Sequence, residues 1–182
     1  MYIQSIRSLG EYTVIREILQ LGNPILRVKC KTVKEFGTPE SHSLIADLRD
    51  TLYDFKQHNG FGRGIAAPQI GITRRVIFIH VDEPIAMFNP LIVKRSKKFF
   101  ALWDDCFSFL NLLVKVKRHS SIEVSYQNEI GEKKKLKASG PLSELLQHEI
   151  DHLNGILAVD RAIDSKHIVL RSEYEKGTKD NS

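Results

Sequence analysis

Residues 147–152 read Q-H-E-I-D-H, and this short segment constrains the fold of the chain more than any other. Side chains four positions apart lie on one face of a helix, so His148 and His152 would project side by side. Neighbouring apolar residues continue this stripe at helical spacing. Two imidazoles and the carboxylate of Glu149 are costly to bury there unless they are paired or bind a metal. The sequence therefore predicts a buried helix over about 142–154.

Patterns elsewhere in the chain indicate a second helix and several strands. Apolar spacing predicts a helix over 40–59, with Ser41 as its N-cap and Gly60 as its end, and Gly155 would end the later helix. Strands are expected at 75–81, 86–94, 112–118, 122–126 and 133–138. This order favours an α+β fold, in which mostly antiparallel sheets pack around a central helix that carries H-E-x-x-H.

The composition is that of an ordinary globular domain. The chain has 182 residues, 42% hydrophobic and 27% charged residues, and a net charge of +5, which argues against a disordered, collagen-like or coiled-coil chain. No apolar run approaches the roughly 18 residues of a membrane span. We expect a single catalytic domain over 1–182, with poorly ordered ends at 1–13 and 171–182, and with no membrane association.

Cysteine content and charge bear on location and partners. Two cysteines are too few for a secreted disulfide scaffold, so we expect a cytoplasmic protein. The modest positive charge is compatible with a transient contact to an anionic surface such as a ribosome, without direct nucleic-acid specificity. More commonly, such a charge only maintains solubility.

A catalytic metal site needs a third protein ligand beside the two histidines. The long zincin pattern would place a third histidine at position 158, which is Ala158 here, and the downstream glutamates lie in a polar tail. An upstream ligand remains, and Cys106 is the best candidate, since a thiolate binds borderline and soft divalent metals well. Cys30, between two lysines, is interpreted as structural. Glu149 would act as general base toward a metal-bound water.

Three motifs, in order along the chain, resemble those of the peptide deformylase family. Residues 62–69 read G-R-G-I-A-A-P-Q and resemble G-x-G-x-A-A-P-Q. Residues 104–108 read D-D-C-F-S and resemble E-G-C-L-S in degraded form. Residues 148–155 read H-E-I-D-H-L-N-G and match the third motif closely. The resemblance extends over roughly Val14 to Ser165.

This resemblance implies an enzyme that removes the N-formyl group from the N-terminal formyl-methionine of nascent polypeptides. It implies that Cys106, His148 and His152 hold one divalent metal ion, with Fe(II) the usual ion and zinc, nickel or cobalt as substitutes. A water on this metal would be the nucleophile. N-formylated nascent peptides would be the binding partners.

The resemblance also assigns residues that act on the substrate. Gln69 and the backbone N–H of Phe107 would stabilise the oxyanion. Glu149 would take a proton and pass it to the leaving amine. The backbone of Gly64 would hold the substrate extended. Substrate contacts are expected from Gly64 and three further residues, namely Arg63, Ile65 and Asp105.

Four positions depart from the family pattern: Arg63, Asp104, Asp105 and Phe107. Arg63 occupies a position that is usually apolar and near the methionine pocket. Its guanidinium would be costly to desolvate unless it meets water or an acid, and Asp104 or Asp105 is the expected acid. These changes affect substrate shape and loop geometry, and none removes a predicted metal ligand.

Two other functions remain open from the sequence. The chain would fit a metal amidase that acts on a different N-acyl substrate. It would also fit a catalytically weak, deformylase-like binding protein. The intact Glu149 and Gln69 argue against the binding protein, because pure binding requires neither residue.

Overall fold

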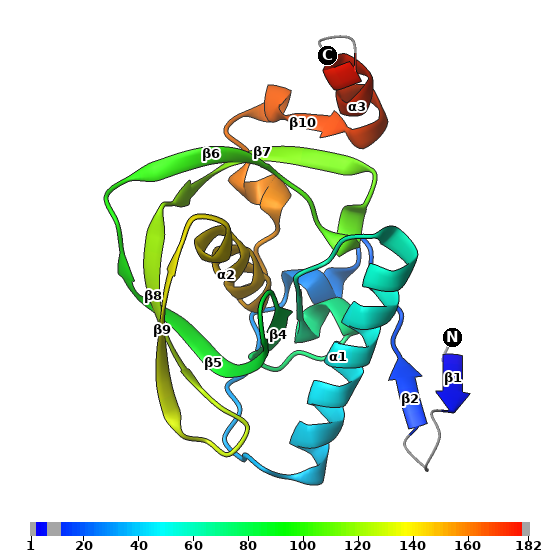
Figure 1. The fold of residues 1–182 in the computed structure, drawn as a ribbon, viewed down its shortest axis with the longest axis vertical. Helices are drawn as coiled ribbons and strands as arrows, with labels where there is room; N and C mark the ends of the chain where they lie inside the picture. The colour runs from blue at the N-terminus through cyan, green and yellow to red at the C-terminus, as the bar shows by residue number, and fades with distance from the viewer. Residues whose placement is uncertain (1–2, 7–11, 180–182) are drawn as a thin grey trace.

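The computed structural model describes residues 3–6 and 12–179 of the chain. Helix α2 (Gly140–Leu153) lies at the centre of the molecule, and the curved strands β5 to β9 enclose it (Figure 1). Helix α1 (Pro39–Asn59) covers another side of the core (Figure 1). All strand pairs named in the sheets are antiparallel. The predicted α+β class, with antiparallel sheets around the H-E-x-x-H helix, is confirmed.

A five-stranded sheet supplies most of the wall around α2. Its order is β3-β4-β5-β8-β9, so β3 and β9 are edge strands. The first four residues of β4 are fully buried, as expected for a continuous apolar strand inside a sheet. The strand bounds are β3 (Gly64–Ala66), β4 (Val76–His80), β5 (Pro84–Arg95), β8 (Ser121–Gln127) and β9 (Lys133–Ser139).

A three-stranded sheet closes the opposite side, with the order β10-β7-β6. Strands β6 (Phe99–Asp104) and β10 (Ile168–Leu170) were not predicted, whereas β7 (Leu112–His119) was. The burial of β6 does not alternate cleanly, since its side chains range from exposed to buried. It is a strand because all six of its residues pair with β7, and its last residue leads directly toward Cys106.

Helix α1 starts at Pro39, one residue before its predicted start, but its N-cap is not the predicted residue. Thr38 is the N-cap, because its hydroxyl accepts a hydrogen bond from the backbone N–H of Ser41, at 3.2 Å. The Thr38 backbone N–H in turn donates to Ser41 Oγ at 3.0 Å, which completes a capping box. The prediction of Ser41 as N-cap was therefore wrong by three residues. Gly60 ends the helix in the left-handed conformation, as expected.

Helix α2 is buried on nearly all sides. Every residue from Ser143 to Leu153 is buried, because sheets and loops surround the helix. It starts at Gly140, two residues before the predicted start, and its C-cap is Asn154. Gly155 follows with a positive φ of 72°. In the described part of the chain, no helix is long and apolar enough to cross a membrane.

Parts of both chain ends are described as regular elements, and the rest of the expected poorly ordered ends lies outside the described residues. Strands β1 (Ile3–Ile6) and β2 (Tyr12–Ile15) pair antiparallel, and α3 (Arg171–Lys179) follows β10. Residues 1–2, 7–11 and 180–182 lie outside the described residues. The pattern at the C-terminal end is too polar to predict a helix by itself, and its contacts with β7 and β10 define its place.

Candidate active site

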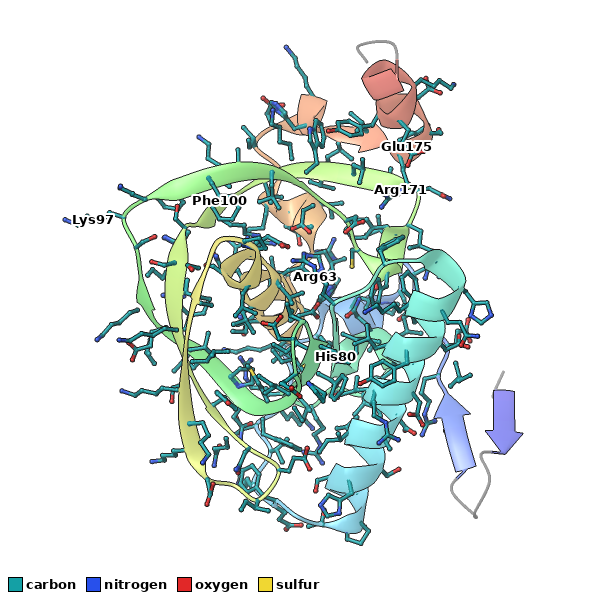
Figure 2. The ribbon with its side chains drawn as sticks, viewed as in Figure 1. Arg63, His80, Lys97, Phe100, Arg171 and Glu175 are labelled. Carbon is teal, nitrogen blue, oxygen red and sulfur yellow. The ribbon has the colours of Figure 1, made fainter. Side chains whose placement is uncertain are left out.

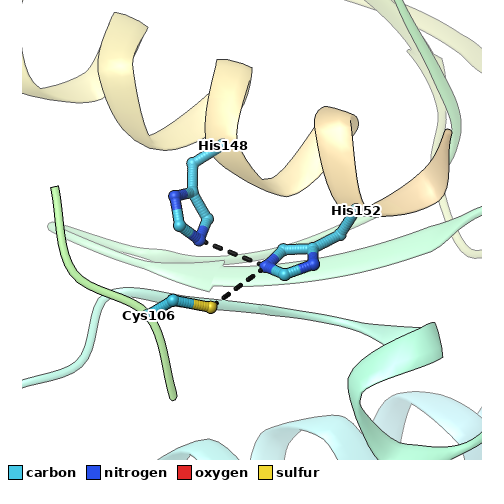
Figure 3. Close-up of side chains that lie close together, drawn as sticks. All are labelled: Cys106, His148 and His152. Carbon is cyan, nitrogen blue, oxygen red and sulfur yellow. Dashed lines mark hydrogen bonds between the residues drawn. The ribbon is translucent and has the colours of Figure 1, made fainter. Parts of the chain in front are cut away.

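Cys106, His148 and His152 converge beside α2, the helix that carries both histidines, as Figure 3 shows. The Cys106 Sγ lies 3.3 Å from His152 Nε2, and that nitrogen lies 3.2 Å from His148 Nε2. All three side chains are buried, and their donor atoms lie within 4.8 Å of one another. The two histidines share a face of α2, whereas Cys106 follows β6 and is 46 residues from His152 in sequence. The expected ligands are thus together in space.

The donor atoms fit one divalent ion. In a tetrahedral site with metal–ligand bonds of about 2.0–2.3 Å, neighbouring donors lie about 3.3–3.7 Å apart. The measured separations of 3.2 and 3.3 Å are close to this value. One thiol sulfur and two facing imidazole nitrogens are also the donor types that borderline metals prefer. A bound cation would allow both nitrogens to face inward without a shared proton.

Asp104 orients the first histidine of this group. Its Oδ1 lies 2.9 Å from His148 Nδ1, so the opposite nitrogen, Nε2, is directed toward Cys106 and His152. Its Oδ2 accepts a hydrogen bond from Arg118 at 3.0 Å. Burial raises the pKa of Asp104, but the charges and hydrogen bonds of His148 and Arg118 outweigh burial and lower this pKa to about 2. Asp104 is therefore a carboxylate at neutral pH.

A chain of ion pairs continues from Asp104 to the protein surface. Arg118 is buried and donates to Asp151 at 2.5 Å, and Asp151 also accepts from Arg161 at 2.8 Å. The Asp151 carboxylate thus contacts two arginines, Arg118 and Arg161. These contacts tie the sheet containing β7 to α2. Sequence reasoning did not assign Arg118 to the site, because its partners lie 14 and 33 residues away with no shared pattern.

The two imidazoles have opposite pKa shifts. Burial lowers the pKa of His148, but the charges of Asp104 and Cys106 outweigh burial and raise this pKa well above its ordinary value. Burial and the neighbouring charge of His148 lower the pKa of His152 well below its ordinary value. The pair therefore resists carrying two protons at once.

Glu149 is buried beside the three ligands. Its Oε2 has no hydrogen-bond partner among the described residues. Burial raises the pKa of this carboxyl to about 7, despite the opposing charge of His148. A group with such a pKa both accepts and releases a proton near neutral pH. A Cβ atom at Gly64 would lie 2.9 Å from Glu149 Oε1, so glycine at position 64 leaves the room that this carboxylate needs.

Gln69 is held by its own turn with its amide directed at the site. Its Oε1 accepts from the backbone N–H of Ala66 at 2.9 Å. Its Nε2 lies 3.6 Å from Cys106 Sγ and 3.4 Å from Ser108 Oγ. Gln69 is therefore an oriented donor rather than a solvated loop residue. Ser108 was not predicted, although it stands two positions after the cysteine.

Phe107 lines the cavity beside Cys106, whereas Ile65 does not. The Phe107 ring stacks on Phe55 with 3.8 Å between ring centroids, and Phe107 lines the cavity beside Cys106. Ile65 is fully buried within the apolar cluster that includes α1, and it does not line that cavity. The Ile65 side chain therefore faces the core rather than this cavity, because alternate residues of a strand face opposite sides.

A cavity of about 510 Å³ opens onto two of the three metal-ligand candidates, Cys106 and His148. Its wall includes the predicted Gly64, Gln69, Cys106, Phe107, His148 and Glu149, together with Arg63 and Asp105. A larger hollow of about 1230 Å³ lies near the start of α1, but the described residues group no metal ligands there. The smaller cavity therefore has the chemistry of an active site.

The acid that meets Arg63 is not one of the two that we expected. Arg63 donates to Glu144 at 2.7 Å, whereas Asp105 pairs with Arg171 at 2.8 Å and Asp104 pairs with His148. Figure 2 places Arg63 between α2 and the end of α1. Glu144 was missed, although it lies four residues before His148 and therefore on the same face of α2.

Comparison with known proteins agrees with this geometry. Residues 15–167 match the family described as polypeptide deformylase. The peptide deformylase of Desulfitobacterium hafniense is 41% identical over 150 residues, which cover 81% of this chain and 95% of that protein. The structure of the Synechococcus elongatus peptide deformylase in complex with actinonin matches with a TM-score of 0.78 and 33% sequence identity. The match covers 84% of this chain and 81% of that chain.

A third relative was solved with a peptide bound. The Acinetobacter baumannii class I type b peptide deformylase, in its Met-Ala-Ser-bound crystal structure, has a TM-score of 0.77 and 28% identity. The match covers 82% of this chain and 99% of that chain. The family model, the sequence relatives and the solved structures agree over most of the chain. This protein belongs to the polypeptide deformylase family, metal-dependent enzymes that remove the N-formyl group from nascent peptides.

Proposed function

We propose that Cys106, His148 and His152 hold one divalent metal ion in this deformylase. Fe(II) is the proposed native ion, with zinc, nickel or cobalt as functional substitutes, in keeping with the family resemblance and the donor types. The convergence of one sulfur and two ring nitrogens within 4.8 Å beside a cavity carries the proposal. When bound, such an ion lowers the pKa of water and polarises the formyl carbonyl.

Glu149 is the proposed general base and acid. It takes a proton from the attacking water as the new carbon–oxygen bond forms. It then gives this proton to the amine as the carbon–nitrogen bond of the formyl amide breaks, which releases formate and a free N-terminus. Its buried position and its pKa of about 7 support both steps.

Two donors are proposed to stabilise negative charge on the former carbonyl oxygen. One is the side-chain amide of Gln69, which the bond to Ala66 holds in place. The other is the backbone N–H of Phe107, the residue directly after Cys106. Preorganised donors act strongly in a water-poor cavity, because they need not reorient as charge develops.

The substrate is proposed to bind as an extended peptide along β3. This strand is at the edge of its sheet, so one side of its backbone is available to pair with a further strand. Gly64 lies on this strand and on the cavity wall. The bound Met-Ala-Ser of the Acinetobacter baumannii relative supports a peptide substrate with methionine as its first residue.

The proposed cellular setting follows from the substrate. N-formylated nascent polypeptides, whose first residue is formyl-methionine, are the partners. The protein would meet them in the cytoplasm as they leave the ribosome. The net charge of +5 supports a transient ribosome contact without nucleic-acid specificity. A single catalytic domain over 1–182 is proposed, which the family match over residues 15–167 supports.

Replacement of the proposed base tests the mechanism. Glu149→Gln keeps the size of the side chain but removes its ability to take a proton. Formate release from formyl-Met-Ala-Ser by Fe(II)-loaded protein, purified without oxygen, is expected to fall by about 10³-fold. Metal content is expected to stay at the wild-type value.

Glu132→Gln is the matched control, because Glu132 is exposed in the β8–β9 turn. It is expected to keep wild-type formate release. Full activity in Glu149→Gln would contradict the proposed base. Absence of formate from the wild-type protein under anaerobic Fe(II) loading would contradict the proposed reaction.

A further inference from the structure

An ion pair forms one wall of the cavity beside the metal ligands. Arg63 donates through one terminal nitrogen to Glu144 at 2.7 Å and through the other to the backbone oxygen of Pro141 at 3.3 Å. Glu144 is buried, with 4% of its surface exposed, whereas the Arg63 side chain is 43% exposed. The pair joins the residue before β3 to the first turns of α2.

The pair lies close to the reacting groups. A carboxylate oxygen of Glu144 lies within 4.8 Å of both an Asp104 oxygen and a His148 ring nitrogen. In any N-formyl peptide, the first side chain branches two bonds from the formyl carbon. A formyl group placed at His148 therefore puts this side chain in the same cavity, within reach of Arg63 and Glu144.

The cavity combines this ion pair with apolar walls. Phe61, Phe107 and Leu145 contribute apolar surface. A purely apolar side chain would remove water from the ion pair without replacing the lost hydrogen bonds, which is unfavourable. Among the described residues, only Arg63 donates to the Glu144 carboxylate, which can accept several hydrogen bonds.

We propose that the Arg63–Glu144 pair makes this subsite favour a polar, uncharged first side chain with the length of methionine. An amide side chain such as glutamine satisfies both partners, since its oxygen accepts from Arg63 and its NH₂ donates to Glu144. The apolar walls hold the methylene stem. Methionine remains a substrate, but an all-hydrocarbon side chain of equal length is disfavoured. This inference rests on the proposed deformylase function.

Paired substrates test the inference. We would measure kcat/KM for formyl-Gln-Ala-Ser and formyl-norleucine-Ala-Ser with metal-loaded protein. In the double variant Arg63→Leu/Glu144→Leu, the glutamine-to-norleucine ratio is expected to fall about tenfold from the wild-type ratio. An unchanged or higher ratio in this variant overturns the inference.

A matched control removes a different ion pair. Glu132, in the β8–β9 turn, and Lys134, near the start of β9, pair at 2.8 Å on the surface, so Glu132→Leu/Lys134→Leu is expected to keep the wild-type ratio. If the first double variant does not fold, Glu144→Gln replaces it, because it keeps the side-chain shape. The ratio is then expected to fall about threefold, and an unchanged ratio again overturns the inference.

Failure of the proposed function is distinguishable from failure of the inference. If no protein releases formate from any peptide, the deformylase reaction is wrong for this chain. Calorimetry with zinc-loaded protein then tests the subsite alone, by comparing Kd for Gln-Ala-Ser and norleucine-Ala-Ser. The Arg63→Leu/Glu144→Leu variant is expected to lose the wild-type preference for the glutamine peptide. If the variant and the wild-type protein have the same ratio of Kd values, the inference is overturned.

Discussion

The carboxylate of Asp104 connects a metal-ligand candidate to the rest of the protein. It lies at the end of β6, contacts His148 Nδ1 at 2.9 Å and accepts from Arg118 at 3.0 Å. Aspartate stands here where the resembled motif E-G-C-L-S has glutamate, which is one methylene longer. A partner of this kind holds the imidazole in one orientation and increases its basicity.

Asp104→Asn is expected to weaken zinc binding about 10–100-fold. The amide oxygen would still accept a hydrogen bond from His148, but the negative charge that raises the basicity of its ring would be lost. Competition with a chromophoric chelator measures the metal Kd. Asp105→Asn is the matched control, since Asp105 is half-exposed and pairs with Arg171 instead. Equal affinities in the two variants would contradict this role of Asp104.

The two long helices end at left-handed glycines whose surroundings differ. Gly60 after α1 has a φ of +77°, and a Cβ built there meets no atom within 4 Å. Gly155 after α2 has a φ of +72°, and its Cβ would lie 2.4 Å from the backbone oxygen of Arg27. The end of α2 is therefore pressed against the turn at Pro24–Arg27. This contact fixes the end of the helix that carries His152.

Gly155→Ala is expected to destabilise the fold by about 3 kcal/mol or more, because it combines left-handed strain with a backbone clash. Gly60→Ala introduces the same strain without the clash and is expected to lose about 1–2 kcal/mol. Urea unfolding of both variants measures the difference in free energy. A loss at Gly155 no larger than that at Gly60 would show that α2 does not depend on this close contact.

At the scale of the whole molecule, two sheets and two helices enclose one set of metal ligands. Cys106 belongs to the apolar cluster around β7, whereas the neighbours of His148 on α2 belong to the cluster beneath the five-stranded sheet. A bound ion would therefore join separate parts of the core. Metal binding and global stability should be coupled, because the unfolded chain does not hold these donors together.

Metal removal is expected to lower the melting temperature. A ligand at about 1,000 times its Kd stabilises the fold by about 4 kcal/mol, which corresponds to roughly 10 °C for a chain of this size. Thermal unfolding with and without zinc, after treatment with a chelator, measures the shift. Glu149→Gln keeps all three ligands and is expected to show the full shift, whereas His152→Ala is expected to show little. A full shift in His152→Ala would contradict the proposed ligand set.

Local patterns were sufficient for much of this fold and for the metal-ligand candidates. The H-E-x-x-H spacing places two imidazoles on one helix face regardless of the rest of the chain, because helix geometry alone determines it. The apolar patterns of β4, β5, β7 and β8 predicted their strands, whereas the lysine-rich β9 was predicted only from the turn at 128–131 that precedes it. Strand β6 was missed, since its pairing with β7, rather than its pattern, makes it a strand.

The sequence by itself determined the central helix, the antiparallel strands and the residue types of a Cys–His–His site. Only the tertiary structure decided which charges meet. Arg63 pairs with Glu144 rather than with Asp104 or Asp105, and Asp104 turns instead to His148 and Arg118. The physical reason is that ion-pair partners are chosen by distance in space. The partners of Arg63 and Arg118 lie 81 and 33 residues away and are brought near only when helix and sheets pack.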